Sequence, residues 1–217
     1  MMALLWIGLV WAGSFPNVEA CLHRQDIACA YEALARWGAH EEAEGALRAA
    51  WAEVHFHAGR YPEAFDDVVV AMETGAEGLE DRRDLYERTL FATTGWVERR
   101  RGRFAVRYRP GPDALLVEEA FDVLEAAEKH LAPRFGGPPP GVTILEIYPD
   151  IDRFTAASSL MKEDVDTTGV VALSKWTRLL VASPRALYRG YDWRDTIAHE
   201  YIHLVVSHHS ADRSPVW

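Results

Sequence analysis

The spacing of apolar residues changes near Thr94, and this change constrains the fold more than any other feature of the chain. Residues 26–93 form Ala-rich stretches whose apolar positions repeat at helical spacing. Residues 96–108 instead alternate between apolar and polar positions on both sides of Arg100-Arg101-Gly102, which predicts a β-hairpin. Helices followed by strands predict an α+β fold with a domain boundary near Thr94.

The rest of the second half predicts further helices and strands. We expect helices over 112–133 and 151–159, and strands over 142–148, 169–173 and 179–182. The four residues from Ser174 to Thr177 are expected to join the last two strands, whereas 161–168 is polar and expected to be exposed. Residues 184–191 predict a loop that leads into a helix with Asp192 at its N-cap.

The helix that follows Asp192 contains His199-Glu200-Tyr201-Ile202-His203, an HExxH pattern. Residues four apart lie on one helix face, one turn from each other, so both imidazoles can approach one ion. Imidazole nitrogens bind Zn²⁺ at about 2.0–2.1 Å, and the Glu after the first ligand is placed to take a proton from a bound water. The pattern therefore predicts His199 and His203 as zinc ligands and Glu200 as a general base. The alternative is that the two His residues lie on the helix surface and form hydrogen bonds with neighbouring carboxylates instead of binding a metal.

Composition and charge narrow the classes of partner. The 217 residues are 49% hydrophobic and 26% charged, as expected for a globular protein with a sizeable core. The formal net charge of −10 disfavours nucleic acid and anionic membrane surfaces as partners. We therefore interpret the Arg cluster of the hairpin as a solvated turn rather than an anion site.

Residues 1–20 have the length and composition of a secretory signal peptide. The apolar run from Leu4 to Ala12 is too short to span a bilayer, and Val18-Glu19-Ala20 fits a small-x-small cleavage site. We expect export to the periplasm or the extracellular space, and no membrane span once the signal is removed. The first residues of the chain include no Lys or Arg, so the alternative is that this segment forms a buried first helix. Cys21, directly after the proposed cleavage site, also permits a lipoprotein anchor.

Cys21 and Cys29 are the only cysteines of the chain. On one straight helix, eight residues would separate them by about 12 Å, too far for a disulfide. A break in the helix within 23–26 would permit the bond in an exported chain. Both arrangements remain open from the sequence.

Within the helical region 21–93, Gly59-Arg60-Tyr61-Pro62-Glu63-Ala64 resembles the turn and second helix of a tetratricopeptide (TPR) repeat. Tyr61 is expected to lie between the helices, and Ala64 and Ala71 permit their close approach. Gly38 begins a weaker copy, but it precedes Gly59 by less than the repeat period of about 34 residues, so the array is degenerate. Such helices either bind a protein partner on a concave face or serve as a scaffold.

Several short segments up to the HExxH motif together resemble one protein family. They are Phe104-Ala105-Val106-Arg107-Tyr108, Tyr148-Pro149-Asp150 with Phe154, Gly169-Val170, Val181-Ala182-Ser183-Pro184, and Asp192-Trp193 ahead of His199-Glu200-Tyr201-Ile202-His203. The family is that of the peptidase MA-like zinc metalloproteases of the gluzincin group, which often follow TPR-type helices in exported bacterial proteins. The resemblance covers a little under half the chain, and only its last motif is specific.

The resemblance implies that residues 94–217 are a zincin-like metallopeptidase domain, with a mixed sheet over the active-site helix. It also implies a third zinc ligand, a Glu on a later helix. No Glu follows Glu200 in the sequence, so we expect only the N-terminal part of that domain here. The alternative third ligand is His209, ten positions after His199, ahead of His208 and Asp212.

The function that the resemblance implies is a zinc-dependent peptidase acting on peptide or protein substrates. The substrate would pair as an extended chain with the edge strand predicted over 169–173. Glu200 would act as base toward the attacking water and then as acid toward the leaving amine. The alternative is a catalytically inactive helical-repeat scaffold, in which a vestigial zincin domain accompanies helices that bind a protein partner.

Overall fold

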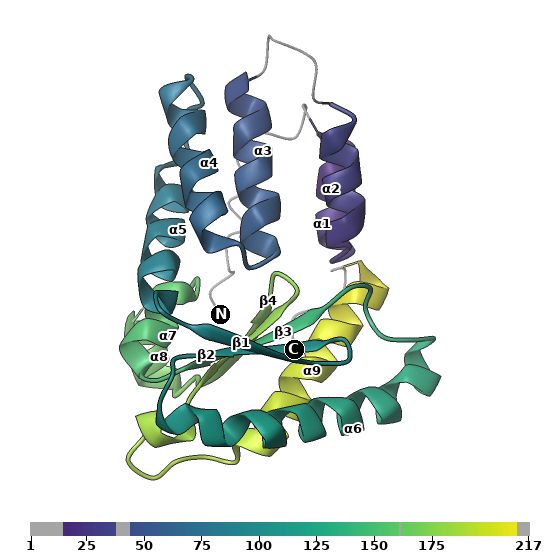
Figure 1. Cartoon of the computed structure of the whole chain (residues 1–217), viewed down its shortest axis with the longest axis vertical. Coiled ribbons are helices and arrows are strands. Elements are labelled where there is room, and N and C mark those ends of the chain that lie inside the picture. The colour runs from purple at the N-terminus through teal and green to yellow at the C-terminus, as the bar shows by residue number, and fades with distance from the viewer. Residues whose placement is uncertain (1–14, 38–43, 161, 212–217) are drawn as a thin grey trace.

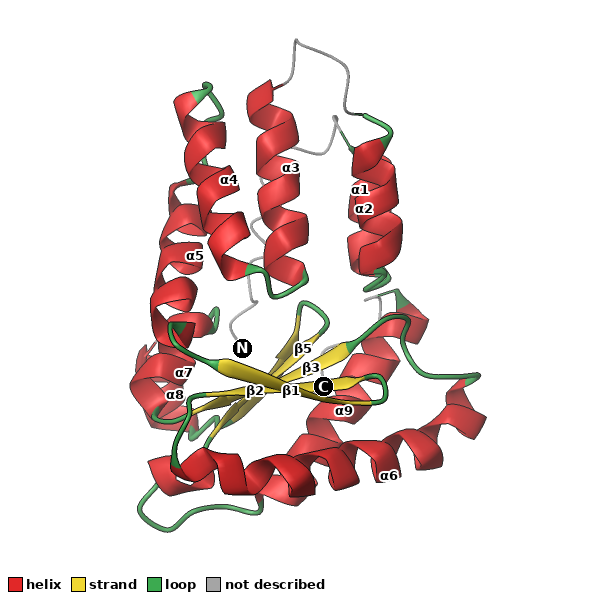
Figure 2. Cartoon of the chain, viewed as in Figure 1, coloured by secondary structure: helices red, strands yellow, loops and turns green. Residues whose placement is uncertain are grey.

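The computed structural model describes residues 15–37, 44–160 and 162–211. A column of helices stands on one face of a twisted sheet, and two long helices lie against the opposite face (Figure 1). Figure 2 shows the sheet as the layer between these helices. The predicted α+β class, with a mixed sheet, is confirmed.

Helices precede the first strand and are interspersed with strands afterwards. The helices are α1 (Pro16–His23), α2 (Ile27–Ala35), α3 (Glu44–His57), α4 (Tyr61–Glu73), α5 (Glu80–Thr93), α6 (Val117–Phe135), α7 (Ile151–Ala157), α8 (Lys162–Thr168) and α9 (Trp193–Ser210). The strands are β1 (Val97–Arg101), β2 (Phe104–Tyr108), β3 (Thr143–Tyr148), β4 (Ala172–Lys175) and β5 (Arg178–Ala182). Short 3-10 turns occupy Pro112–Leu116 and Pro184–Ala186.

The five strands are arranged in the order β1-β2-β3-β5-β4. The three central strands are parallel, whereas each edge strand is antiparallel to its neighbour. The hairpin predicted over 96–108 is confirmed, with Val97 opposite Tyr108. The strands predicted over 142–148 and 179–182 are confirmed as β3 and β5. Helix α6 makes the crossover from β2 to β3 that a parallel pair requires.

Successive side chains of β3 and β5 point to opposite faces of the sheet. Leu145 and Ile147, with Leu179 and Val181, pack against α6 and α9 in the largest buried cluster. Tyr148 and its neighbours on the other face pack against α7 and the end of α5. Burying a Leu or Ile side chain contributes roughly 1.5–3 kcal/mol, so the first cluster holds α9 firmly against the sheet.

The edge strand predicted over 169–173 is present as β4, but its predicted bounds are wrong. We expected a strand over 169–173 and a link from Ser174 to Thr177, but β4 begins at Ala172 and continues to Lys175. The link is therefore only the two residues Trp176 and Thr177. Both have positive φ, of 53° and 65°, a conformation that these residue types rarely adopt and that no local pattern predicts.

The segment 161–168 was expected to be polar and exposed, and this is wrong for Val165. Residues Lys162–Thr168 form α8, and Val165 is buried in the cluster on the α7 side of the sheet. A single apolar residue in a polar run gives no periodicity from which a helix could be predicted.

The α3–α4 hairpin brings the helices onto the sheet. Its turn contains Gly59, at φ 70°, and a side chain there would collide with the guanidinium of Arg107 on β2. Arg107 instead donates a hydrogen bond of 2.6 Å to the Gly59 carbonyl oxygen. Tyr61 lies between the helices, with its ring 5.7 Å from that of Phe56, while its hydroxyl reaches the sheet.

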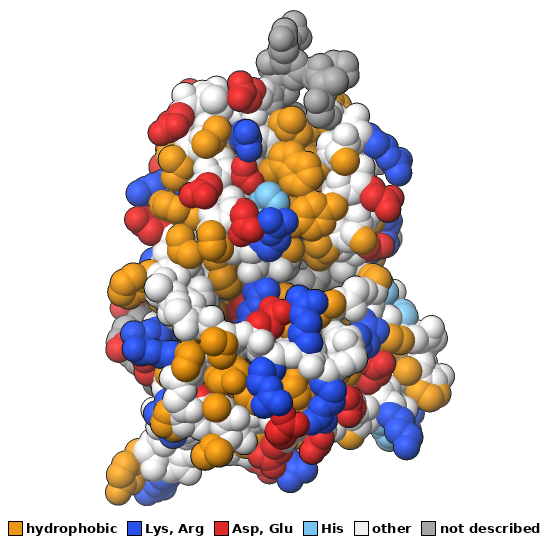
Figure 3. Space-filling view, in the orientation of Figure 1, with side chains coloured by type: hydrophobic (Ala, Val, Ile, Leu, Met, Phe, Trp, Pro, Cys, Tyr) orange, Lys and Arg blue, Asp and Glu red, His pale blue; other side chains and the backbone are white. Residues whose placement is uncertain are grey.

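The Arg cluster of the β1–β2 hairpin is paired with acidic side chains of α6. Arg99 and Arg101 each lie 2.5 Å from a carboxylate oxygen of Glu118, and Arg101 also contacts Asp122 at 2.6 Å. Figure 3 shows the blue and red side chains side by side on this face. The charges are locally compensated, as expected of a solvated turn rather than of a site for an external anion.

The N-terminal helices contain a disulfide. Helix α1 ends at His23, Gln25 adopts φ 57°, and the Asp26 side chain caps α2 by accepting from the Cys29 N–H at 3.0 Å. This break brings the Cα atoms of Cys21 and Cys29 to 5.6 Å, and the two sulfurs are bonded. A lipid anchor on Cys21 would require the same sulfur.

Reducing this disulfide should lower the free energy of unfolding by about 2–3 kcal/mol, because the bond closes a short loop in the unfolded chain. Urea unfolding with and without dithiothreitol measures the change. The double variant Cys21→Ser/Cys29→Ser is the control and should show no effect of the reductant. Equal urea midpoints for the oxidised and reduced wild-type chain would contradict this expectation.

The predicted signal peptide lies partly outside the described residues. The proposed cleavage sequence Val18-Glu19-Ala20 forms part of α1, where Val18 is buried against α3. Among the described helices, none combines the length and the apolarity needed to cross a bilayer.

Candidate metal centre

The helix that carries the HExxH motif is fixed at its start and along one face. Asp192 caps α9 by accepting a hydrogen bond from the Asp195 N–H at 3.3 Å, as predicted. The buried side chains of α9 recur at helical spacing, and all of them belong to the large core cluster. They are Trp193, Ile197, Tyr201, Leu204 and Val205. The side chains between them therefore point away from that core.

The two imidazoles of the motif converge. The Nε2 atoms of His199 and His203 are 2.9 Å apart, and the ring centroids are 4.5 Å apart. His199 is exposed and His203 is half-buried. Burial lowers the pKa of His203, and the neighbouring His199 lowers it further, which favours the neutral imidazole that a metal ion requires.

Glu200 is less exposed to solvent than His199, the residue before it. Its side chain is half-buried, and this burial raises its pKa. The nearby His199 and the backbone of Ser174 on β4 oppose this rise in the pKa. Strand β4 packs against α9, so the edge strand lies beside the helix that carries the motif.

Strand β4 lies at the edge of the sheet and pairs with β5 on one side. Among the residues that the structure describes, no strand pairs with its outer side. An unpaired strand edge presents backbone N–H and C=O groups to which another extended chain can add. The expected edge strand is thus present beside Glu200, shifted from 169–173 to Ala172–Lys175.

The other His residues of α9 are engaged elsewhere. His209 Nε2 lies 3.0 Å from the Gly137 carbonyl oxygen, and its ring is 6.0 Å from that of Phe135. His208 Nδ1 lies 2.6 Å from the Arg24 carbonyl oxygen. Asp212 falls outside the described residues. Within the described part of the chain, no group of three or more His, Cys, Asp or Glu side chains is arranged to hold a metal ion.

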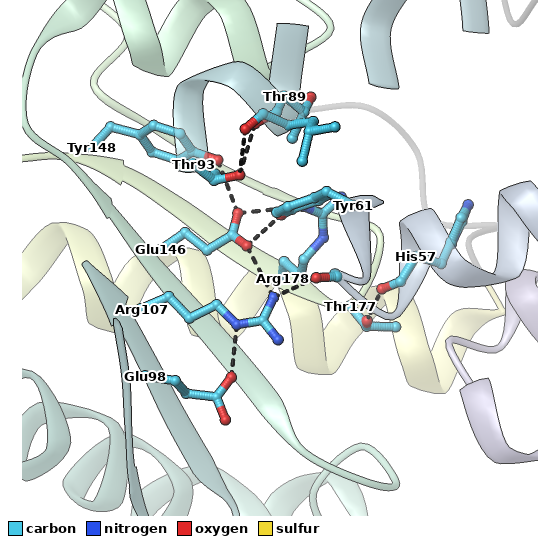
Figure 4. A network of polar contacts seen from close by, with 12 residues as sticks. His57, Tyr61, Thr89, Thr93, Glu98, Arg107, Glu146, Tyr148, Thr177 and Arg178 are labelled. Atoms are coloured by element: carbon cyan, nitrogen blue, oxygen red, sulfur yellow. Dashed lines mark hydrogen bonds and ion pairs between the residues drawn. The ribbon is translucent and has the colours of Figure 1, made fainter. Parts of the chain in front are cut away.

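A second polar cluster, which we did not predict, lies between the helical column and the sheet (Figure 4). The carboxylate of Glu146 on β3 accepts hydrogen bonds from Tyr61 and from Tyr148, the latter at 2.9 Å. Arg178 on β5 is 3.3 Å from the same carboxylate, and Arg107 is 3.6 Å from it. Both Glu146 and Arg178 are completely buried.

Burial dominates the electrostatics of this cluster. It raises the pKa of Glu146 to about 7, against the opposing charge of Arg107 and the hydrogen bond from Tyr148. The guanidinium of Arg178 lies 4.8 Å from the ring centroid of Phe56 and 4.9 Å from that of Tyr61. These aromatic faces partly replace the water that the cation has lost. The available sequence signals were Glu146 inside the apolar strand β3 and Arg178 at the start of the apolar strand β5.

No family model, curated protein or solved structure shows a significant match to this chain.

Proposed function

We propose that this chain carries a zinc-dependent peptidase centre on α9, with His199 and His203 as ligands and Glu200 as general base. The observation that supports it most is the convergence of the two Nε2 atoms at 2.9 Å, one residue away from a half-buried carboxylate. A zincin-like identity for the sheet with α9, and a TPR-like identity for α3–α4, form part of the proposal. The disulfide between Cys21 and Cys29 supports an exported protein.

The donor set fits Zn²⁺. Two nitrogens at about 2.0–2.1 Å from a tetrahedral ion lie about 3.3 Å apart, so the observed pair would need to open by only a few tenths of an ångström. One neutral imidazole donating to the other would also account for the close approach in the absence of an ion. The described residues supply two protein ligands, so further positions would be filled by water or by residues outside the described part.

Zinc, when bound, would polarise the scissile carbonyl and acidify a water molecule. Glu200 would accept the proton of that water and later deliver it to the leaving amine. Its raised pKa, caused by burial, suits a group that must both take up and release a proton. The outer edge of β4, which packs against α9, would align an extended peptide beside the His pair.

The alternative function, an inactive helical scaffold, receives less support. Its helices would be expected to act independently of the zincin-like part. Instead the α3–α4 turn is joined to the sheet through Tyr61, Glu146 and Arg178, all of them buried. This favours helices that support the centre over helices that merely accompany it.

Zinc binding tests the proposal directly. We expect the 217-residue chain to bind one Zn²⁺ with a Kd weaker than roughly 1 µM, because two protein ligands bind less tightly than a complete set. His199→Ala and His203→Ala should each weaken binding at least tenfold. Competition against a fluorescent zinc indicator at pH 7.5 measures these constants.

His209→Ala is the matched control, since its imidazole lies on the same helix but faces Gly137. It should bind zinc as the wild-type chain does. Loss of binding in His209→Ala, with His199→Ala unaffected, would exclude the proposed ligand pair.

A further inference from the structure

A cavity of about 380 Å³ opens where the helical column meets the β1 edge of the sheet. Its walls are the start of α4, the end of α5 and the connection from α5 into β1. The apolar residues of its lining are Tyr61, Pro62, Leu90, Trp96 and Val97. The column covers the face of the sheet opposite α9, so the cavity is separate from the candidate metal centre (Figure 1). Its volume lies within the range of small-molecule sites.

Two opposite charges line the same cavity. Glu98 on β1 lies directly across from Arg107 on β2, and Arg107 lies across from Glu146 on β3. Figure 4 shows Arg107 between these two carboxylates. The side chains of Glu98 and Arg107 are 27% and 20% exposed, so both can be reached from solvent.

The guanidinium of Arg107 has a nitrogen to offer. Its Nε donates to Glu98 at 2.7 Å, and its Nη1 donates to the Gly59 carbonyl oxygen at 2.6 Å. The third nitrogen, Nη2, makes no hydrogen bond with any residue that the structure describes. A carboxylate that enters the cavity would find in Nη2 a charged donor of the kind that binds carboxylates strongly.

Charge complementarity selects the class of ligand. A simple anion at Arg107 would also approach the Glu98 carboxylate, and like charges brought together lower the affinity. A simple cation at Glu98 would meet the Arg107 guanidinium in the same way. A ligand that carries an ammonium group beside a carboxylate pairs with both side chains. Free α-amino acids carry these two groups on one carbon atom.

We propose that this cavity binds a free α-amino acid with an apolar side chain. Arg107 Nη2 holds the carboxylate, Glu98 holds the ammonium group, and the apolar side chain packs against Leu90 and Trp96. The Trp96 Nε1–H is buried and makes no hydrogen bond with the described residues, so its resonance is a local reporter of a bound ligand. The site does not depend on the proposed peptidase centre.

The test titrates L-phenylalanine into the ¹⁵N-labelled 217-residue chain, with a chelator present so that no metal bound by the His pair contributes. The Trp96 indole resonance, assigned by its loss in Trp96→Phe, and the amides of β1 should shift with a Kd on the order of 0.1–1 mM. 3-Phenylpropionate lacks the ammonium group and 2-phenylethylamine lacks the carboxylate. Each should bind about tenfold more weakly or worse, because one charged hydrogen bond is lost. L-Alanine, which lacks the ring, should also bind at least about tenfold more weakly.

Glu98→Gln separates the proposed site from non-specific binding. It should weaken L-phenylalanine and strengthen 3-phenylpropionate, because the carboxylate that repels the anion is gone. Glu118→Gln is the matched control, since Glu118 pairs with Arg99 and Arg101 of the same hairpin, and it should leave both affinities unchanged.

The proposal is overturned if 10 mM L-phenylalanine shifts neither the Trp96 indole nor the β1 amides. Equal affinities of the wild-type chain for L-phenylalanine and 3-phenylpropionate would also overturn it, and this comparison needs no variant. A chain that binds this amino acid but no zinc would contradict the proposed function and leave the cavity assignment standing.

Discussion

Replacing Glu200 by Gln should lower zinc-dependent peptide hydrolysis by about 100- to 10,000-fold, the usual contribution of a general acid–base group. The amide has nearly the shape of the carboxylate but cannot take up a proton from water. Zinc binding by His199 and His203 should persist in this variant. Initial rates of cleavage of an unfolded protein at saturating Zn²⁺, corrected for the rate with a chelator, measure the change.

Glu87→Gln is the matched control for this experiment. Glu87 is an exposed residue of α5 that pairs with Arg83, and its replacement should leave the rate unchanged. Equal hydrolysis by Glu200→Gln and the wild-type chain would show that Glu200 is not the base.

Replacing Glu146 by Leu should lower the free energy of unfolding by about 3–5 kcal/mol, the typical cost of removing one partner of a buried ion pair. Arg178 would keep its charge in a fully buried position without its counter-ion, and the Tyr61 and Tyr148 hydroxyls would lose their acceptor. Urea unfolding followed by tryptophan fluorescence measures the loss.

The double variant Glu146→Leu/Arg178→Met provides the comparison. Replacing both members of a buried pair by apolar residues is often neutral or stabilising, so the double variant should recover much of the stability. A loss below about 1 kcal/mol for Glu146→Leu alone would mean that solvent reaches the cluster, because exposed pairs contribute that little.

The elements that could be predicted from the sequence are those with local causes. The alternation around Arg100-Arg101-Gly102 predicts the β1–β2 hairpin, and the position of Asp192 predicts the start of α9. The close approach of His199 and His203 likewise follows from their spacing on one helix.

The features that could not be predicted depend on residues far apart in the chain. Tyr61 meets Glu146 across 85 positions, and Thr177 meets His57 across 120. The short turn at Trp176 runs against local preference and exists because α3 packs on it. The half-buried setting of Glu200 likewise depends on distant residues, since β4 packs against the helix that carries the motif.

The most direct test of the proposed centre is the response of the imidazole ¹⁵N resonances to Zn²⁺. We predict that the Nε2 resonances of His199 and His203 shift together and stop shifting once one ion is bound per chain. Those of His208 and His209 should not move. A titration in which His199 or His203 shifts without the other, or in which neither shifts while zinc binds, would contradict the shared metal site.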